Sequence, residues 1–212
     1  GAGHEITGLN ATSGLFKQIG GGSHIQSLTL RGTMTCASST SGGSVVGYAN
    51  GKNIVIESCF SYVTVTGTGR NVGGIVGYAN STTTIRNCAS LGAVTGSDSV
   101  GGIIGGFVGS GAVITGCYST GAVAATGSTA GGIFGNGSYG ITVTNCYNTG
   151  AVSANSNAGG IGGKKIEFKL YDPQNDAAQV PQRLTEAKND GCVAVVFAVG
   201  DDLAPTAAEW AE

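Results

Sequence analysis

The six cysteines of this chain are its most prominent reactive residues, and four of them recur at a fixed interval. Cys59, Cys88, Cys117 and Cys146 follow one another at intervals of 29 residues. Thiols in such a series can form disulfides, bind a metal or pack as small apolar side chains. We favour packing in a core ladder, because the equivalent position of the first repeat is Leu28, which fills a core but has no redox or metal chemistry.

Other candidates for catalysis are few. Cys36 and Cys192 lie outside the ladder, and we expect them to be free thiols. Asp201 and Asp202 are the only paired carboxylate cluster, and they follow an apolar run as a turn does. The sequence lacks the close Cys and His pairs that bind zinc and the His-Glu-x-x-His motif of zinc peptidases. We therefore predict no catalytic residue, no metal site, no cofactor and no enzymatic activity.

Two sets of aromatic residues recur with the repeat: Phe60, Tyr118 and Tyr147, each directly after a ladder cysteine, and Tyr48 with Tyr78. Ala89 interrupts the first set. If the cysteines point inward, strand alternation turns the next side chain outward. Exposed rings can stack on sugars or on a partner protein, so these five residues are the candidate contacts for a host glycan or protein. Ring stacking that only shields the surface is the alternative.

Three short phrases, repeated in fixed order, would position these side chains. A Gly-Gly-Ile-Val-Gly phrase begins at Gly73 and recurs from Gly101 and Gly131, with a looser copy from Gly43. An Ile-x-x-Cys phrase follows each copy, and a Gly-Ala-Val phrase comes next. The phrases are rich in Val, Ile and Thr and are bounded by Gly, Ser and Asn, which is typical of strands. One repeat cannot bury its inward side chains alone, so successive repeats must stack.

The sequence thus predicts an all-β fold, a parallel β-solenoid (β-helix) of about five coils over residues 1–163. The coils would begin near residues 14, 44, 74, 102, 132 and 160, with strands paired in register. The chain contains 40 glycines, which we expect at corners that need positive φ. Strand alternation predicts that only one member of each adjacent apolar pair, such as Ile75 and Val76, faces inward.

Residues 164–212 do not continue the repeat. The segment 164–170 alternates charged and apolar residues, 176–188 resembles a helix, and 192–199 is an apolar run typical of a buried strand. We predict a small α/β cap over the open end of the solenoid. The alternative is the beginning of a further domain.

Charge and hydropathy exclude two classes of partner. The net charge is −2 and the ten Lys and Arg residues form no basic stripe, so we expect no nucleic-acid partner. No stretch of eighteen apolar residues is present, so we predict no membrane span in this chain.

The three phrases resemble, over residues 14–163, the GLUG-motif repeats of large secreted or surface-anchored bacterial proteins. These proteins include adhesin-like proteins and immunoglobulin A-specific metallopeptidases. The resemblance implies an extracellular or cell-surface location and a non-catalytic structural or adhesive module, and it carries over no site residue. Two alternatives stay open: a carbohydrate-binding or polysaccharide-active β-helix that uses the outward aromatic rows, and a non-catalytic fragment of a larger secreted enzyme.

Overall fold

The structure is a computed structural model that describes residues 4–37, 41–108, 111–137 and 140–162. Over these residues it contains twenty-five strands and no helix, which confirms the all-β class. The chain divides into two units, Gly1–Lys165 and Ile166–Glu212. The predicted α/β cap over 164–212, with Asp201, Asp202 and Cys192, lies outside the described residues. The described part of the chain has no helix long and apolar enough to cross a membrane.

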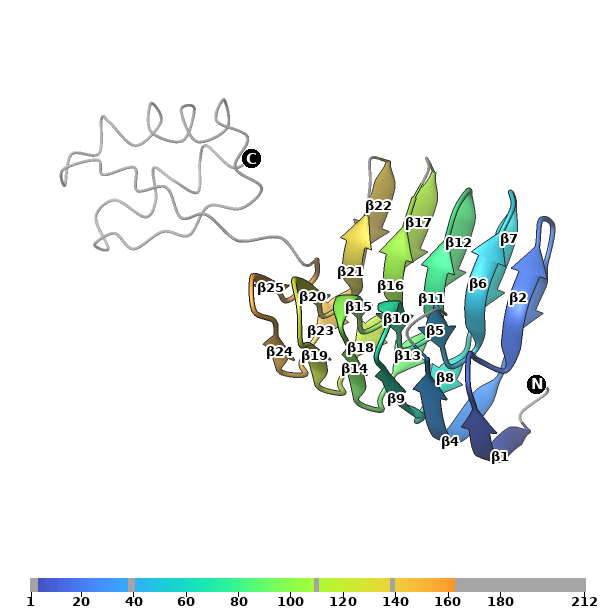
Figure 1. Cartoon of the computed structure of the whole chain (residues 1–212). Helices are drawn as coiled ribbons and strands as arrows, with labels where there is room; N and C mark the ends of the chain where they lie inside the picture. Colours follow the sequence, from blue (N-terminus) through green and yellow to red (C-terminus); the bar gives the residue numbers. More distant parts are fainter. Residues whose placement is uncertain (1–3, 38–40, 109–110, 138–139, 163–212) are drawn as a thin grey trace, which may run out of the picture. The chain divides into compact units, whose positions relative to one another are not determined.

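The first unit is a parallel β-solenoid whose chain passes through four sheets in turn (Figure 1). Sheets 1, 2 and 4 each contain five strands, one per coil, which confirms about five coils. Sheet 1 consists of β2 (Phe16–Gly20), β6 (Val46–Asn50), β11 (Val76–Ala79), β16 (Ile104–Phe107) and β21 (Phe134–Gly137). Sheet 2 consists of β3 (His24–Gln26), β7 (Ile54–Glu57), β12 (Thr83–Arg86), β17 (Ala112–Thr115) and β22 (Ile141–Thr144).

Sheet 3 has two limbs, because the long strand β4 (Thr29–Cys36) pairs with a strand of each limb. One limb holds β8 (Phe60–Ser61), β13 (Ala89–Ser90), β18 (Tyr118–Ser119) and β23 (Tyr147–Asn148). The other holds β9 (Thr64–Gly67), β14 (Val94–Gly96), β19 (Val123–Ala125) and β24 (Val152–Ser153). Sheet 4 consists of β5 (Gly42–Gly43), β10 (Arg70–Gly73), β15 (Asp98–Gly101), β20 (Thr129–Gly131) and β25 (Asn157–Gly159).

Matching phrases lie directly over one another, as the sequence predicts. In sheet 2 the β-branched residue of the Ile-x-x-Cys phrase occupies one register position in five successive coils: Ile25, Ile56, Ile85, Ile114 and Val143. These pairings are all parallel. A side chain that recurs in the sequence therefore becomes a column along the solenoid.

The inward side chains form one continuous apolar core. Ile75 and Val76 are both fully buried, and so are Ile103 and Ile104, with at most 1% exposed. The expectation that only one member of each pair faces inward is therefore wrong for these coils. The reason is that Ile75 lies between β10 and β11, where the chain changes direction, so the alternation of a straight strand does not apply.

Positive φ occurs at some glycines, as expected, but not at the glycines of the later Gly-Gly-Ile-Val-Gly phrases. The corner before Cys117 is Gly116, with φ of 62°, while the corners before the other ladder positions have φ between 52° and 56° at polar residues, namely Ser27, Ser58, Asn87 and Asn145. Gly73 instead lies where two coils touch. A Cβ there would be 2.0 Å from the carbonyl oxygen of Val76 and 2.6 Å from the nitrogen of Gly105. The phrase thus needs glycine because two backbones approach closely.

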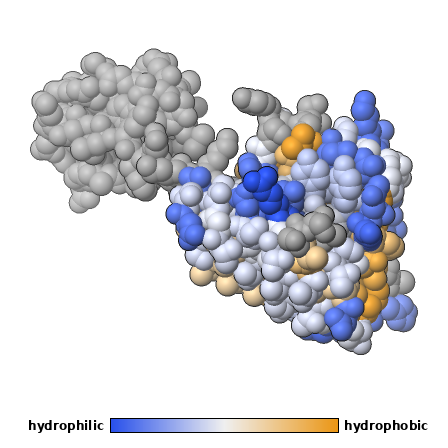
Figure 2. All heavy atoms as spheres, in the orientation of Figure 1, coloured by the Kyte–Doolittle hydropathy of each residue, from blue (hydrophilic) through white to orange (hydrophobic). Residues whose placement is uncertain are grey.

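An additional strand precedes the first phrase. β1 (Glu5–Ala11) pairs in parallel with β4, with a register shift between Ile6 and Leu9. Ile6 and Phe16 are 38% and 40% exposed. Figure 2 shows hydrophobic surface gathered at the edge of the unit where β1 and β2 lie, beside a mainly hydrophilic face. The sequence did not predict β1, because residues 5–11 carry none of the three phrases.

Candidate functional site

The cysteines of the repeat lie at one corner, each directly after a strand of sheet 2 and the turn residue that follows it. Cys59, Cys88 and Cys117 are buried and Cys146 is half-buried, and all are free thiols. The backbone nitrogens of Cys88 and Cys117 lie 3.4 Å from the Sγ of Cys117 and Cys146, respectively. Leu28 takes the same place in the first coil, since its carbonyl accepts the N–H of Phe60 at 2.7 Å.

These thiols do not share one electrostatic environment. The Sγ of Cys88 donates to the carbonyls of Arg86 and Ile56 at 3.3 and 3.6 Å. The neighbouring thiols of Cys117 and Cys59, and then burial, raise the pKa of Cys88, whereas the hydrogen bond with Cys88 lowers the pKa of Cys59 and of Cys117. Cys59, Cys88 and Cys117 all belong to the apolar core, which is the packing position that the sequence predicts. Across the described residues, no group of three or more His, Cys, Asp or Glu is placed to hold a metal ion.

Cys36 lies outside this corner, at the end of β4. It is buried and free, and its Sγ donates to the carbonyl of Thr66 at 3.5 Å. Burial raises the pKa of the Cys36 thiol. Cys36 therefore packs as a protonated thiol.

The first aromatic row lies on sheet 3 and faces outward. Phe60, Ala89, Tyr118 and Tyr147 occupy one register position. Phe60 and Tyr147 are 37% and 52% exposed, whereas Ala89 is fully buried. The rings of Tyr118 and Tyr147 are stacked with centroids 5.2 Å apart and planes 3° apart. These two rings therefore cover part of each other's faces.

Tyr48 and Tyr78 lie on sheet 1 and occupy one register position in adjacent coils. Their ring centroids are 5.5 Å apart and their planes are tilted by 38°. The side-chain nitrogen of Asn80 donates to the Tyr48 hydroxyl at 2.8 Å and to Oδ1 of Asn50 at 2.8 Å. Burial raises the pKa of Tyr78. The hydrogen bond from Asn80 therefore fixes the hydroxyl of Tyr48, and the ring of Tyr78 packs against that of Tyr48.

Two groups of polar residues were not predicted from the sequence. One is an ionic cluster across three coils, in which Glu57 contacts His24 at 2.6 Å and Arg86 at 2.5 Å. Hydrogen bonds from Arg86 and then His24 lower the pKa of Glu57.

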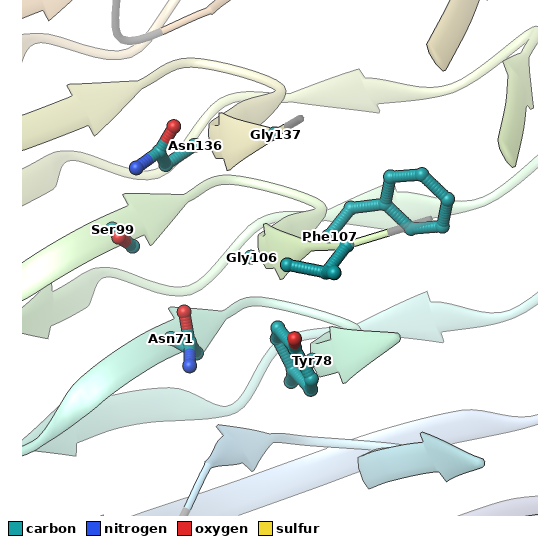
Figure 3. A pocket seen from close by; sticks show the side chains of 8 residues that line it. Asn71, Tyr78, Ser99, Gly106, Phe107, Asn136 and Gly137 are labelled. Atoms are coloured by element: carbon teal, nitrogen blue, oxygen red, sulfur yellow. The ribbon is translucent and has the colours of Figure 1, made fainter. Parts of the chain in front are cut away.

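The other group lines a pair of hollows beside the tyrosines. Asn71 and Tyr78 line both hollows, which have volumes of about 230 and 400 Å³. Figure 3 shows Asn71 and Tyr78 in one layer of the smaller hollow, with Ser99 and Gly106 in the next and Asn136 beyond them. The pairing register would have revealed this column, because Tyr48, Tyr78, Gly106 and Asn136 are successive partners. The sequence repeat alone did not, since the residue type changes at each step.

Comparison with known proteins supports the fold. No family model and no curated protein matches the sequence. A solved structure named as a "putative immunoglobulin A1 protease" from Bacteroides ovatus superposes with a TM-score of 0.56 at 22% sequence identity. The match covers 88% of this chain and 71% of the other. At this identity, the likeness shows a shared fold.

Proposed function

We propose that this chain is a non-catalytic structural and adhesive repeat module, of the GLUG type, within a larger secreted or cell-surface bacterial protein. The observation that carries the proposal is the in-register stacking of five coils, which turns one short phrase into a long, regular surface. Repeat solenoids typically use such extended surfaces for binding.

Two further observations support it. The described cysteines are free thiols that pack in or against the apolar core, and burial raises the pKa of Cys36 and Cys146. The structurally similar protein from Bacteroides ovatus is named as a putative immunoglobulin A1 protease, which agrees with a place in a large secreted protein.

The experiment displays the chain on the surface of a non-adherent bacterial strain. Retention of these cells under flow on an epithelial cell layer is compared with that of cells displaying an unrelated domain of similar size. We expect greater retention, and no cleavage of immunoglobulin A1 by the purified chain. Retention equal to the control, or cleavage of the immunoglobulin, would contradict the proposal.

A further inference from the structure

We propose that the groove beside Tyr48 and Tyr78 binds a neutral glycan chain; this inference rests on the proposed adhesive function and assigns its contact site. The two hollows share Asn71 and Tyr78, so they form one groove that passes from coil to coil. The larger hollow, of about 400 Å³, falls within the roughly 300–1,000 Å³ of small-molecule sites, and the smaller one, of about 230 Å³, lies below that range.

The groove runs between two columns of side chains. One column comes from sheet 1 and contains Gln18, Tyr48, Tyr78, Gly106 and Asn136 in register. The other column lies along sheet 4 and contains Ser41, Asn71 and Ser99. Each of these residues directly precedes one of three residues that pair in register, namely Gly42, Val72 and Val100. Three successive coils therefore contribute one residue to each wall, as Ser41 with Tyr48, Asn71 with Tyr78 and Ser99 with Gly106, and the groove passes from coil to coil.

A glycine in the middle of this groove makes room for the side chain of Asn71. Gly106 occupies the position of Tyr78 in the following coil. A Cβ on Gly106 would lie 2.2 Å from Oδ1 of Asn71 and 3.1 Å from Cδ2 of Tyr78. The space that a side chain would fill is therefore taken by the end of Asn71, which presents an amide to the hollow (Figure 3).

The backbone holds the polar wall in an uncommon conformation. Asn71 and Ser99 have φ of 57° and 53°. Non-glycine residues adopt the left-handed region rarely, and such residues cluster at functional sites. The N–H of Ser99 is fixed by Oδ1 of Asp98 at 2.9 Å and by the hydroxyl of Thr129 at 3.1 Å. The wall is therefore preorganised before any ligand binds.

The chemistry of the lining points to an uncharged, hydroxyl-rich ligand. Amides, hydroxyls and two tyrosine rings line the groove together with the apolar Phe107 and Val108, and Lys17 is its single charged side chain among the described residues. Arg70 and Asp98, next to the polar wall, pair with each other at 3.7 Å. Amides and hydroxyls both donate and accept hydrogen bonds, as sugar hydroxyls do, while a tyrosine ring offers an apolar face with a polar tip. An acidic polymer would need more than one cation.

The aromatic row on sheet 3 meets these conditions less well. Tyr118 and Tyr147 stack flat against each other, so the faces that a sugar would use are partly occupied. Neither hollow includes a residue of that row. The structure therefore favours Tyr48 and Tyr78 over the row on sheet 3 as the glycan contact, a choice that the sequence left open.

The test is binding of the purified full chain to a printed array of neutral glycans, acidic glycans and unglycosylated peptides. We expect binding to neutral glycans, and loss of about tenfold or more in affinity in Tyr78→Ala, because an aromatic platform typically dominates such contacts. Gly106→Val should cause a similar loss, because its side chain would displace the amide of Asn71 and crowd the ring of Tyr78. Circular dichroism and urea unfolding must show that both variants are folded. Tyr147→Ala is the matched control and should bind as the wild type does.

Three results would overturn the inference. They are no binding to any neutral glycan, binding confined to acidic glycans or peptides, and loss of binding in Tyr147→Ala with none in Tyr78→Ala. The cell-retention assay distinguishes a failure of the glycan inference from a failure of the proposed adhesive function. If cells displaying Tyr78→Ala are retained as well as wild-type cells, adhesion is real and the groove is not its site.

Discussion

Two adjacent glycines of β16 provide a sharp test of how the coils pack. Gly105 and Gly106 point to opposite faces of the same strand. A Cβ on Gly105 would lie 2.4 Å from the nitrogen of Val72 and 2.5 Å from the carbonyl carbon of Asn71. Ordinary contact begins at about 3.5 Å, so Gly105→Ala must move the backbone of β10 or β16 by about 1 Å.

We expect Gly105→Ala to lower the free energy of unfolding by about 3 kcal/mol or more. Overpacking typically costs about 1–3 kcal/mol, and here the crowded atoms are backbone atoms that no rotamer change can move aside. Gly106→Ala is the control, because its nearest atom is the end of the Asn71 side chain, which can rotate. Replacing a strand glycine also gains roughly 0.5–1 kcal/mol, so Gly106→Ala should stay within about 1 kcal/mol of the wild type.

Urea unfolding followed by far-UV circular dichroism measures both effects. With a denaturant slope of roughly 1–3 kcal/mol/M, the midpoint of Gly105→Ala should fall by roughly 1–3 M, while that of Gly106→Ala should hardly change. Equal midpoints for the two variants would refute the close backbone packing of β10 against β16. A larger loss in Gly106→Ala would refute it as well.

Three further predictions concern the core, the thiols and the ionic cluster. Ile103→Ala should lower the free energy of unfolding by about 2–5 kcal/mol, because Ile103 is fully buried. Val108→Ala is the control and should change it by less than about 0.5 kcal/mol, because the side chain is 51% exposed. Equal effects of the two substitutions would contradict the core assignment. Thiol titration in denaturant should find all five described cysteines free, and fewer than four reactive thiols would refute the packing role. In the native protein Cys146 should react first, because it is half-buried and the other four described cysteines are buried. Its rate should increase as pH rises towards its pKa, which burial raises. The pKa of Glu57 lies below its usual 4.5. The contribution of Glu57 to stability is therefore complete above pH 4.5 and is lost as the pH falls through the lowered pKa of the folded state. Acid unfolding that is identical in Glu57→Gln and the wild type would contradict this.

The repeat allowed the sequence to predict the architecture well. The cysteines recur every 29 residues, and a β-branched residue lies three places before each of them. These two regularities define which strands pair, and they predict the observed pairing of Ile56 with Ile85. The same logic placed Leu28 at the cysteine position of the first coil. Local pattern and global fold agree in these segments, which is why they could be read without a structure.

The reasons for individual residue types were harder to predict. Glycine at 73 and 105 serves contact between coils, and sequence shows a glycine without showing what approaches it. Some positive-φ corners fall on residues such as Ser58 and Asn87, where the equivalent corner of a later coil has Gly116; serine and asparagine tolerate that conformation less readily than glycine. The groove was missed for a related reason: its walls combine residues 28–30 positions apart, such as Tyr78 and Gly106, that share a register but no chemical type.

The register of the sheets has a consequence for how such a molecule can vary. Each coil presents to its successor the same row of N–H and C=O groups that it received from its predecessor. Tandem duplication or deletion of one unit of the gene would therefore change the number of layers and leave the remaining interfaces chemically equivalent. Paralogues built in this way would differ in length by steps of about 4.8 Å, and the side chains of the added coil would determine the shape of the groove at that step.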